Sequence, residues 1–328
     1  MVILLLVFSA GSIWLSSDSG TRFLTNKVPP FVTETINADF SAKEISYEFP
    51  FHINFNQALI KDLRKDTLFY IESGEAEFGR FDFRINSLII NNITLNKAWF
   101  NGRKHKNDSM FNYMHFIDNL SGDEESEGSG GLFRILFNNI SLNSTRFTHW
   151  DYNESFTPTR QIDYDHLDVF NIKMNVNKFE VVGSRLNIDL TRLYAEERSG
   201  FVLNFLKTRF YLDDQNMQFR DLTLETRFSR ISRSIAFSFD STSHLSDFIN
   251  KVDFNAQFQE SYISLNDLHY FAPGLDELEK TVFIDGTVTG KVKNFKSKDL
   301  ELRFGKGAYV NGSIYVSGLP EIEETFMN

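Results

Sequence analysis

The densest group of side chains that could do chemistry lies between Asp163 and Asp168, where three aspartates surround His166. Carboxylates and imidazoles are the groups that enzymes most often use for proton transfer and metal binding. Neighbouring side chains of a β-strand point to opposite faces. On a strand, Asp163 and Asp165 would therefore share one face, while His166 and Asp168 would share the other. The pattern favours a solvated strand over a catalytic cluster.

Other signatures of catalysis are missing from the sequence. It contains no HExxH, GxxxxGK[ST], GxSxG or GxGxxG motif and no cysteine, and its seven histidines stand far apart. The formal net charge of −10 and the pI near 5.3 argue against nucleic acid as a partner. We therefore expect a protein that is not an enzyme and that uses no metal or cofactor.

The strongest structural pattern runs from Gly79 to Trp99. Phe81, Phe83 and Ile85 alternate with polar residues, which is typical of a β-strand with one apolar face. The alternation slips at Asn91-Asn92, where we expect the strand to bend or reverse. Residues 89–96 (IINNITLN) are echoed by residues 136–143 (LFNNISLN), which predicts a sheet built by stacking similar strands.

Similar alternation continues along most of the chain, and phenylalanine is abundant, with 35 residues. The segment 45–55 alternates around Pro50 and indicates an edge strand. We predict a mainly β fold: an elongated, curled, antiparallel-type sheet of repeats, shaped like a groove, with a few short helices and an N-terminal membrane helix. A β-sandwich would show the same alternation and remains open. The predicted lining of the groove is Phe81, Phe83, Ile85, Phe137, Phe237 and Phe239.

Residues 1–17 contain no charged side chain and predict a membrane anchor, although they are shorter than the ~20 residues of a full span. A cleaved signal peptide and a buried helix are the alternatives. The residues expected in the membrane are Leu4, Leu5, Leu6, Phe8 and Trp14. Residues 18–30 are predicted to be a linker, because Pro29 and Pro30 should prevent a helix from continuing.

The remaining organisation follows from composition and period. Residues 31–121 should form the first part of the β body and end in a short helix marked by Met110, Tyr113, Met114 and Ile117. Residues 122–131 (GDEESEGSGG) predict an acidic flexible loop, with a weak Ca²⁺ site as the less favoured interpretation. Residues 132–328 should form the rest of the β body, which we expect to continue beyond the last residue as part of a longer protein.

The order of these features resembles the N-terminal region of the TamB family, the inner-membrane components of the translocation and assembly module, within the AsmA-like superfamily. The resemblance covers nearly the whole chain, and its order is more specific than any single piece. It is carried by the apolar N-terminus followed by residues 28–30 (VPP), 66–70 (DTLFY), the two Asn-Asn strands, 199–201 (SGF), 221–226 (DLTLET), 264–268 (SLNDL), 271–273 (FAP), 312–320 (GSIYVSGLP) and 324–326 (ETF).

This resemblance implies a single-pass inner-membrane protein whose bulk lies in the periplasm of a diderm bacterium and carries phospholipid along an apolar β-groove toward the outer membrane, supporting envelope integrity. It also implies an alternative role as a scaffold for assembling or translocating outer-membrane or secreted β-proteins with an outer-membrane barrel partner, through a region absent from this chain. The family supplies no catalytic residues. A carbohydrate-binding or glycosidase domain is a third, weaker hypothesis.

Overall fold

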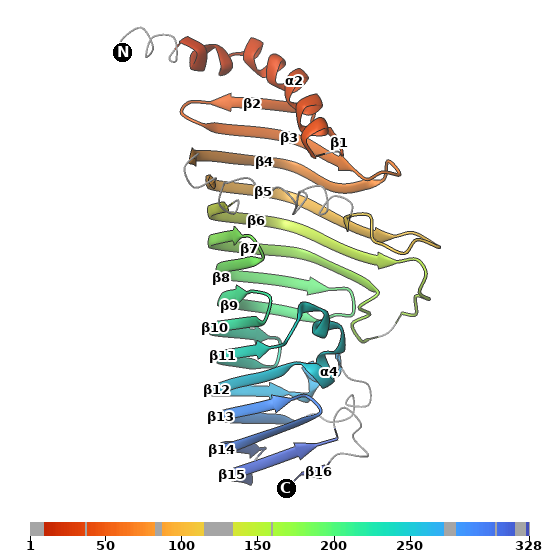
Figure 1. Cartoon of the computed structure of the whole chain (residues 1–328), viewed down its shortest axis with the longest axis vertical. Coiled ribbons are helices and arrows are strands. Elements are labelled where there is room, and N and C mark those ends of the chain that lie inside the picture. Colours follow the sequence, from red (N-terminus) through yellow and green to blue (C-terminus); the bar gives the residue numbers. More distant parts are fainter. Residues whose placement is uncertain are drawn as a thin grey trace. The chain divides into compact units, whose positions relative to one another are not determined.

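The structure, a computed structural model, describes residues 10–36, 38–82, 87–114, 134–158, 160–271, 280–305, 307–318 and 326–327 (Figure 1). The chain divides into two compact units, and each is described by itself. Unit 1 comprises residues 1–159, 163–175 and 195–198, and unit 2 comprises residues 160–162, 176–194 and 199–328.

The described part of unit 1 begins with helical residues 10–15 and helix α2 (Asp18–Ile36). The helix contacts β1 (Asp39–Ser41) and β2 (Glu44–Glu48), two short strands that both pair with β3 (His52–Lys61) and so form one edge of the sheet (Figure 1). Among the described residues, no helix combines the length and the apolar character needed to cross a membrane.

Two threonines of α2 bind the backbone of this edge. The Thr25 hydroxyl accepts a hydrogen bond from the Ile45 N–H (2.8 Å) and donates to the Ile45 carbonyl (3.3 Å). The Thr33 hydroxyl does the same for Phe40, at 3.0 Å and 3.4 Å. Edge strands expose backbone groups that other chains can pair with, and α2 satisfies some of them here.

The expected linker is wrong in its local structure, because α2 runs through Pro29 and Pro30. A proline inside a helix costs ~3 kcal/mol through the lost hydrogen bond and the clash with the preceding turn. The contacts of Thr25 and Thr33, on either side of the two prolines, hold the helix against the sheet and offset this cost.

The remaining strands of unit 1 are hydrogen-bonded in the order of the chain, β3-β4-β5-β6 (Figure 1). Their pairing is antiparallel except between β5 and β6, which are parallel. Parts of two further strands belong to this unit and continue in unit 2. The strands are β4 (Thr67–Asp82), β5 (Ser87–Lys104), β6 (Arg134–Asp151), β7 (His166–Val182) and β8 (Arg185–Glu197).

The parallel pair explains the repeated sequence. Residues 89–96 of β5 lie beside residues 136–143 of β6 with identical positions of the repeat opposite each other. Asn139 Nδ2 donates to Asn92 Oδ1 and Asn143 Nδ2 donates to Asn96 Oδ1, both at 2.9 Å. Such asparagine ladders are typical of like residues that stack in register. The prediction that the two segments stack is therefore confirmed for this pair.

Unit 2 contains an antiparallel series in which each strand pairs with the next along the chain. Short helices η1 (Thr242–Asp247), α4 (Phe248–Lys251) and α5 (Leu265–Leu268) interrupt it. The prediction of a mainly β, largely antiparallel fold with few short helices is confirmed. The strands are β9 (Val202–Leu212), β10 (Asn216–Thr226), β11 (Arg230–Ser238), β12 (Asp253–Ser264), β13 (Thr281–Lys291), β14 (Asn294–Phe304), β15 (Ala308–Ser317) and β16 (Phe326–Met327).

Within the described residues, six strands each carry one non-glycine residue with a φ of 47–53°, where the apolar alternation changes phase. In β10, Phe219 is the last apolar residue of the first phase and Leu222 the first of the second, with Asp221 between them at a register shift. A bulge takes up one extra residue and keeps both segments on the same face. The six residues are Gln57, Lys97, Ser144, Asn171, Asp221 and Glu260.

One expected strand boundary is wrong. Residues 45–55 do not form one edge strand, because the chain reverses at Pro50 and makes the β2–β3 hairpin. At Asn91, where we expected a bend or a reversal, β5 continues, and a register shift against β4 marks a bulge, which bends a strand without reversing it. The acidic loop 122–131 and Ile117 of the expected helix lie outside the described residues.

Candidate functional site

The phenylalanine-rich face of unit 2 is one candidate site. Residues that are paired across antiparallel strands point to the same face of a sheet. The register therefore places two rows of mostly apolar side chains on one face of β9–β15. The first row is Leu212, Met217, Phe237, Phe254, Gly290, Phe295 and Val316. The second row is Phe210, Phe219, Ile235, Ala256, Val288, Ser297 and Ile314.

Ring contacts join neighbouring strands along this face. The rings of Phe210 and Phe219 lie 5.0 Å apart, and those of Phe219 and Phe237 lie 6.3 Å apart, edge to face. The rings of Phe254 and Phe295 lie 6.0 Å apart across β13, where Gly290 has no side chain to separate them. The opposite face carries mainly polar residues, namely Tyr211, Gln218, Ala236, Asn255, Thr289, Lys296 and Tyr315.

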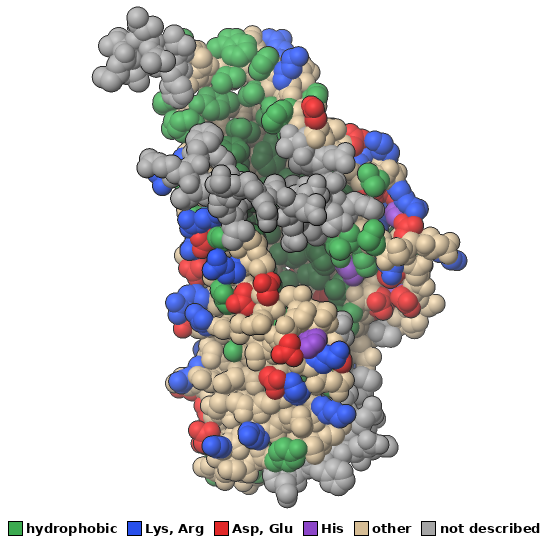
Figure 2. All heavy atoms as spheres, in the orientation of Figure 1, with side chains coloured by type: hydrophobic (Ala, Val, Ile, Leu, Met, Phe, Trp, Pro, Cys, Tyr) green, Lys and Arg blue, Asp and Glu red, His purple; other side chains and the backbone are tan. Residues whose placement is uncertain are grey.

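Unit 1 has an apolar face of the same kind. One row crosses β1, β3, β4, β5 and β6 and contains Phe40, Ile60, Phe69, Phe100 and Phe147. The Phe100 and Phe147 rings stack 5.5 Å apart, which places both on one face. A second row contains Gly74, whose absent side chain leaves room for the Phe55 ring, since a Cβ there would lie 2.4 Å from it. Figure 2 shows hydrophobic side chains gathered over the first strands of this unit, where the surface is hollowed.

Both faces are only half covered. Phe69, Phe100, Phe219 and Phe254 are neither buried nor fully exposed. Among the described phenylalanines, Phe239 alone belongs to the fully buried core, with 5% of its surface exposed. Within the described residues no second sheet packs on either face, as a β-sandwich would require.

The predicted groove residues have different positions. Phe137 and Phe237 lie on the apolar faces, and Phe237 also contacts the Phe248 ring of α4 at 5.1 Å. Phe239 lies in the core just after β11. Phe81 belongs to β4 opposite Leu88, but its side chain is not described. Phe83 and Ile85 lie outside the described residues.

The predicted anchor lies almost entirely outside the described residues, which exclude Leu4, Leu5, Leu6 and Phe8. Trp14, in the helical residues 10–15, is 46% exposed, and its ring lies 5.4 Å from that of Phe23 in α2.

The cluster around His166 is structural. His166 is 1% exposed, its Nδ1 lies 2.8 Å from Asp163 Oδ2, and its Nε2 lies 3.0 Å from the Asp151 carbonyl. The expected separation of Asp163 from His166 is wrong, because Asp163 precedes β7 in a turn. Asp168 instead pairs with Arg146 at 2.7 Å. With both ring nitrogens engaged, the imidazole has no nitrogen available for a substrate.

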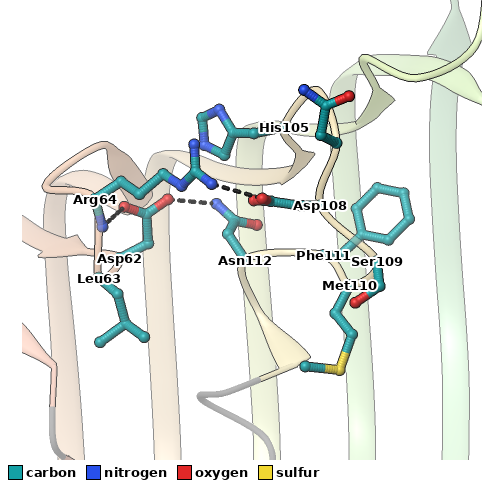
Figure 3. Close-up of a pocket in the computed structure, with 10 residues that line it drawn as sticks. Asp62, Leu63, Arg64, His105, Asp108, Ser109, Met110, Phe111 and Asn112 are labelled. Carbon is teal, nitrogen blue, oxygen red and sulfur yellow. Dashed lines mark hydrogen bonds and ion pairs between the residues drawn. The ribbon is translucent and has the colours of Figure 1, made fainter.

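A second site, which sequence reasoning missed, lies where the β3–β4 turn meets the loop after β5. A cavity of about 340 Å³ is lined there by residues 62–64 and by His105 and residues 107–112 (Figure 3). Arg64 Nη2 donates to Asp108 Oδ1 at 2.6 Å, and Asn112 Nδ2 donates to Asp62 Oδ2 at 2.9 Å. Some 40 residues separate the two segments, so no local spacing signals the site.

Aromatic rings pack behind this cavity. The Phe111 ring stacks on His149 with 3.9 Å between ring centres, and Tyr113 lies 5.7 Å from Phe100. Burial lowers the pKa of His149 and raises the pKa of Tyr113. Both groups are therefore held in their neutral forms near pH 7, which suits packing rather than proton transfer.

The polar face of unit 1 carries one further electrostatic feature. Glu77 accepts hydrogen bonds from the side-chain amides of Asn92 and Asn91, and these donors lower the pKa of its carboxyl. The asparagine ladder thus ends on a carboxylate that stays charged at neutral pH.

Comparison of the sequence with models of known protein families and with curated proteins finds no match.

Proposed function

We propose that the chain binds the acyl chains of phospholipid along the apolar faces of its sheet and carries lipid away from the inner membrane. In this proposal the N-terminal residues around Leu4 and Phe8 anchor the chain, and both units lie in the periplasm. The resemblance to the TamB family points to the same function. A sheet that curls around the acyl chains would shield them from water more completely than a flat sheet would.

One observation carries the proposal: the phenylalanine rows are continuous from strand to strand yet only half buried. A soluble protein normally covers a continuous apolar surface of this kind, because contiguous exposed apolar patches favour association. Phe219, Phe237 and Phe254 contact one another or their neighbours and still remain accessible. Such a surface suits a long, flexible, apolar ligand that can lie along several strands.

The energetics favour an acyl chain over a compact ligand. Each methylene removed from water contributes ~0.8 kcal/mol, so contact with about six methylenes would contribute roughly 5 kcal/mol. An acyl chain can reach this value on a shallow surface without a deep pocket. It also needs no polar partner, and the two rows offer few polar groups.

Photo-crosslinking in cells tests the proposal. The probe replaces Phe237 in unit 2 or Phe137 in unit 1, and lipid adducts are identified by mass spectrometry. The matched controls are Ala236 and Ser141, which lie on the polar face of the same two strands. Lipid adducts at the two phenylalanines and none at the controls would support the proposal. Protein-only adducts at Phe137 and Phe237 would refute it.

A charge substitution separates lipid binding from folding. Phe237→Asp should abolish lipid adducts at a probe on Phe219, whose ring is its neighbour on the apolar face of unit 2, because a carboxylate interrupts the apolar row. Ala236→Asp adds the same charge on the opposite face and should leave the adducts unchanged. If both variants lose adducts equally while the circular dichroism spectrum is retained, the face does not determine lipid binding.

A second function, a scaffold for β-rich client proteins, is favoured by a different observation. Within the described residues, β15 pairs with β14 along its length, whereas β16 pairs only with Val316 and Ser317. An open strand edge can accept an extended client by β-augmentation. Probes at Tyr309 and Asn311 should then crosslink to client polypeptides. Their absence, with lipid adducts at Phe237, would leave lipid transport as the function.

A further inference from the structure

Three potential metal ligands converge beside the cavity of Figure 3. Asp62 and Asp66 come from the turn between β3 and β4, and His105 follows the end of β5. One ligand atom from each residue lies within 4.8 Å of the other two. The group therefore joins two segments that are distant in sequence.

Asp62 is a buried carboxylate without a counter-charge among the described residues. It is 8% exposed and accepts hydrogen bonds from the backbone N–H groups of Arg64 and Asp66 and from the Asn112 amide, each at 2.9 Å. All of these donors are neutral amide groups, and Figure 3 draws the hydrogen bonds from the Arg64 backbone and from the Asn112 side chain. No ion pair found within the described residues includes Asp62. Burying a charge without an opposite charge is costly, so a cation at this position would stabilise the fold.

The imidazole of His105 supplies a second, independent observation. Its Nε2 atom is buried and has no hydrogen-bond partner among the described residues, although Asp66 Oδ2 lies only 3.4 Å away. The ring stacks on Tyr152, with 6.2 Å between ring centres, which fixes its orientation. A buried ring nitrogen that faces carboxylates and makes no hydrogen bond is arranged like a metal ligand.

We propose that Asp62, Asp66 and His105 bind a divalent transition-metal ion, with Zn²⁺ as the best fit. Zn²⁺ accepts imidazole nitrogen and carboxylate oxygen at about 2.0–2.2 Å, and water would complete its coordination. Ligand atoms around such an ion lie roughly 3.5 Å apart, so the three groups need to move together by about 1 Å. Ca²⁺ and Mg²⁺ are disfavoured because they take oxygen ligands only. The ion would tie the β3–β4 turn to the loop after β5.

The nearby arginines determine how tightly the ion binds. Arg64 is paired with Asp108, which takes up its charge. Arg103 Nη1 lies 3.9 Å from Asp66 Oδ2 and competes with the ion for that carboxylate. Arg103→Gln should therefore tighten binding of Zn²⁺. Adventitious binding of Zn²⁺ elsewhere on the surface would not respond to this substitution.

The test is titration of the intact, chelator-treated chain in mild detergent with Zn²⁺, followed by calorimetry and by thermal unfolding. We expect one Zn²⁺ per chain, a higher melting temperature with Zn²⁺, and at least tenfold weaker binding for His105→Asn. The matched control is His244→Asn: within the part of the chain that the structure describes, His244 also has a buried ring nitrogen without a hydrogen-bond partner, but it makes one ion-pair contact, with Asp240 at 4.0 Å.

Two results would overturn the proposal. One is that the wild-type chain binds no stoichiometric Zn²⁺; the other is that His105→Asn and His244→Asn weaken binding equally, which would mean adventitious binding. If His105→Asn fails to fold, Asp66→Asn replaces it, because the Asp66 side chain is 42% exposed and tolerates substitution. Asp66→Asn must then lose Zn²⁺ binding while it keeps the wild-type melting temperature in chelator.

Discussion

Replacing Thr25 by valine should open the sheet edge beneath α2. Valine has nearly the same shape as threonine but lacks the hydroxyl that bonds both the N–H and the carbonyl of Ile45. Ile45 is 3% exposed, so water does not readily replace the lost partner. The substitution therefore leaves a buried backbone N–H unsatisfied while it changes the packing very little.

The magnitude follows from two hydrogen bonds. Each contributes about 0.5–1.5 kcal/mol net, so Thr25→Val should lower the free energy of unfolding by about 1–3 kcal/mol. Thr25→Ser keeps the hydroxyl and should cost less than about 1 kcal/mol. Thr33 binds Phe40 in the same manner eight residues along the helix, about 12 Å away, so the effects of the two valine substitutions should add.

Hydrogen exchange gives the most direct measurement. The Ile45 amide should exchange about 5- to 150-fold faster in Thr25→Val, as expected for a loss of 1–3 kcal/mol. Amides of β13 in unit 2 serve as an internal control and should not change. If Thr25→Val and Thr25→Ser give the same exchange rate at Ile45 and the same denaturation midpoint, the hydroxyl does not protect the edge and the reasoning fails.

Three further predictions concern single residues. Gly74→Ala should lower the free energy of unfolding, measured by urea titration, by about 1–3 kcal/mol, because the added Cβ would collide with the Phe55 ring. Gly307→Ala is the control and should be nearly neutral, because the space around Gly307 is open. Asp267→Ala should lower the free energy of unfolding by about 3 kcal/mol, because this carboxylate is 4% exposed and accepts hydrogen bonds from two hydroxyls at 2.5 Å and from one backbone N–H. A decrease of less than about 0.5 kcal/mol would contradict this role. For Asp213, hydrogen bonds from a backbone N–H and a tyrosine hydroxyl hold the pKa of the carboxyl below 3.8. Its stabilising effect is therefore present above pH 3.8 and lost as the pH falls through the lowered pKa, so the stability difference between the wild-type chain and Asp213→Asn should shrink in acid. A difference independent of pH would show that the charge is not responsible.

The alternation of residue types was sufficient to predict the β fold and much of its apolar face. Phe137 and Phe237 could be placed there because period-two patterning is a local property of the strand. The repeat of residues 89–96 in residues 136–143 also pointed to stacking. Its parallel direction could not be predicted, since identical strands can pair in either direction and the choice depends on the connection between them.

The failures arise where tertiary contacts override local rules. Pro29 and Pro30 remain helical because α2 is held to the sheet edge on both sides of them. Asp163 reaches His166 because a turn, rather than a strand, precedes β7. The group of Asp62, Asp66 and His105 could not be found from spacing, because a register between distant strands brings it together.

The bulges have a consequence for how this chain tolerates insertions and deletions. Each bulge residue, such as Asp221 in β10, shifts the alternation of side chains by one residue, so that the apolar residues after the bulge point to the same face as those before it. Deleting Asp221 would turn Leu222 and Leu224 toward water and bring their polar neighbours onto the apolar face. Deleting one residue and inserting another in the same strand segment would preserve the frame. We therefore expect these strands to accept a deletion only together with a nearby insertion. A single inserted residue should be accepted where it can form an additional bulge. Gaps in alignments of related chains should follow the same two rules.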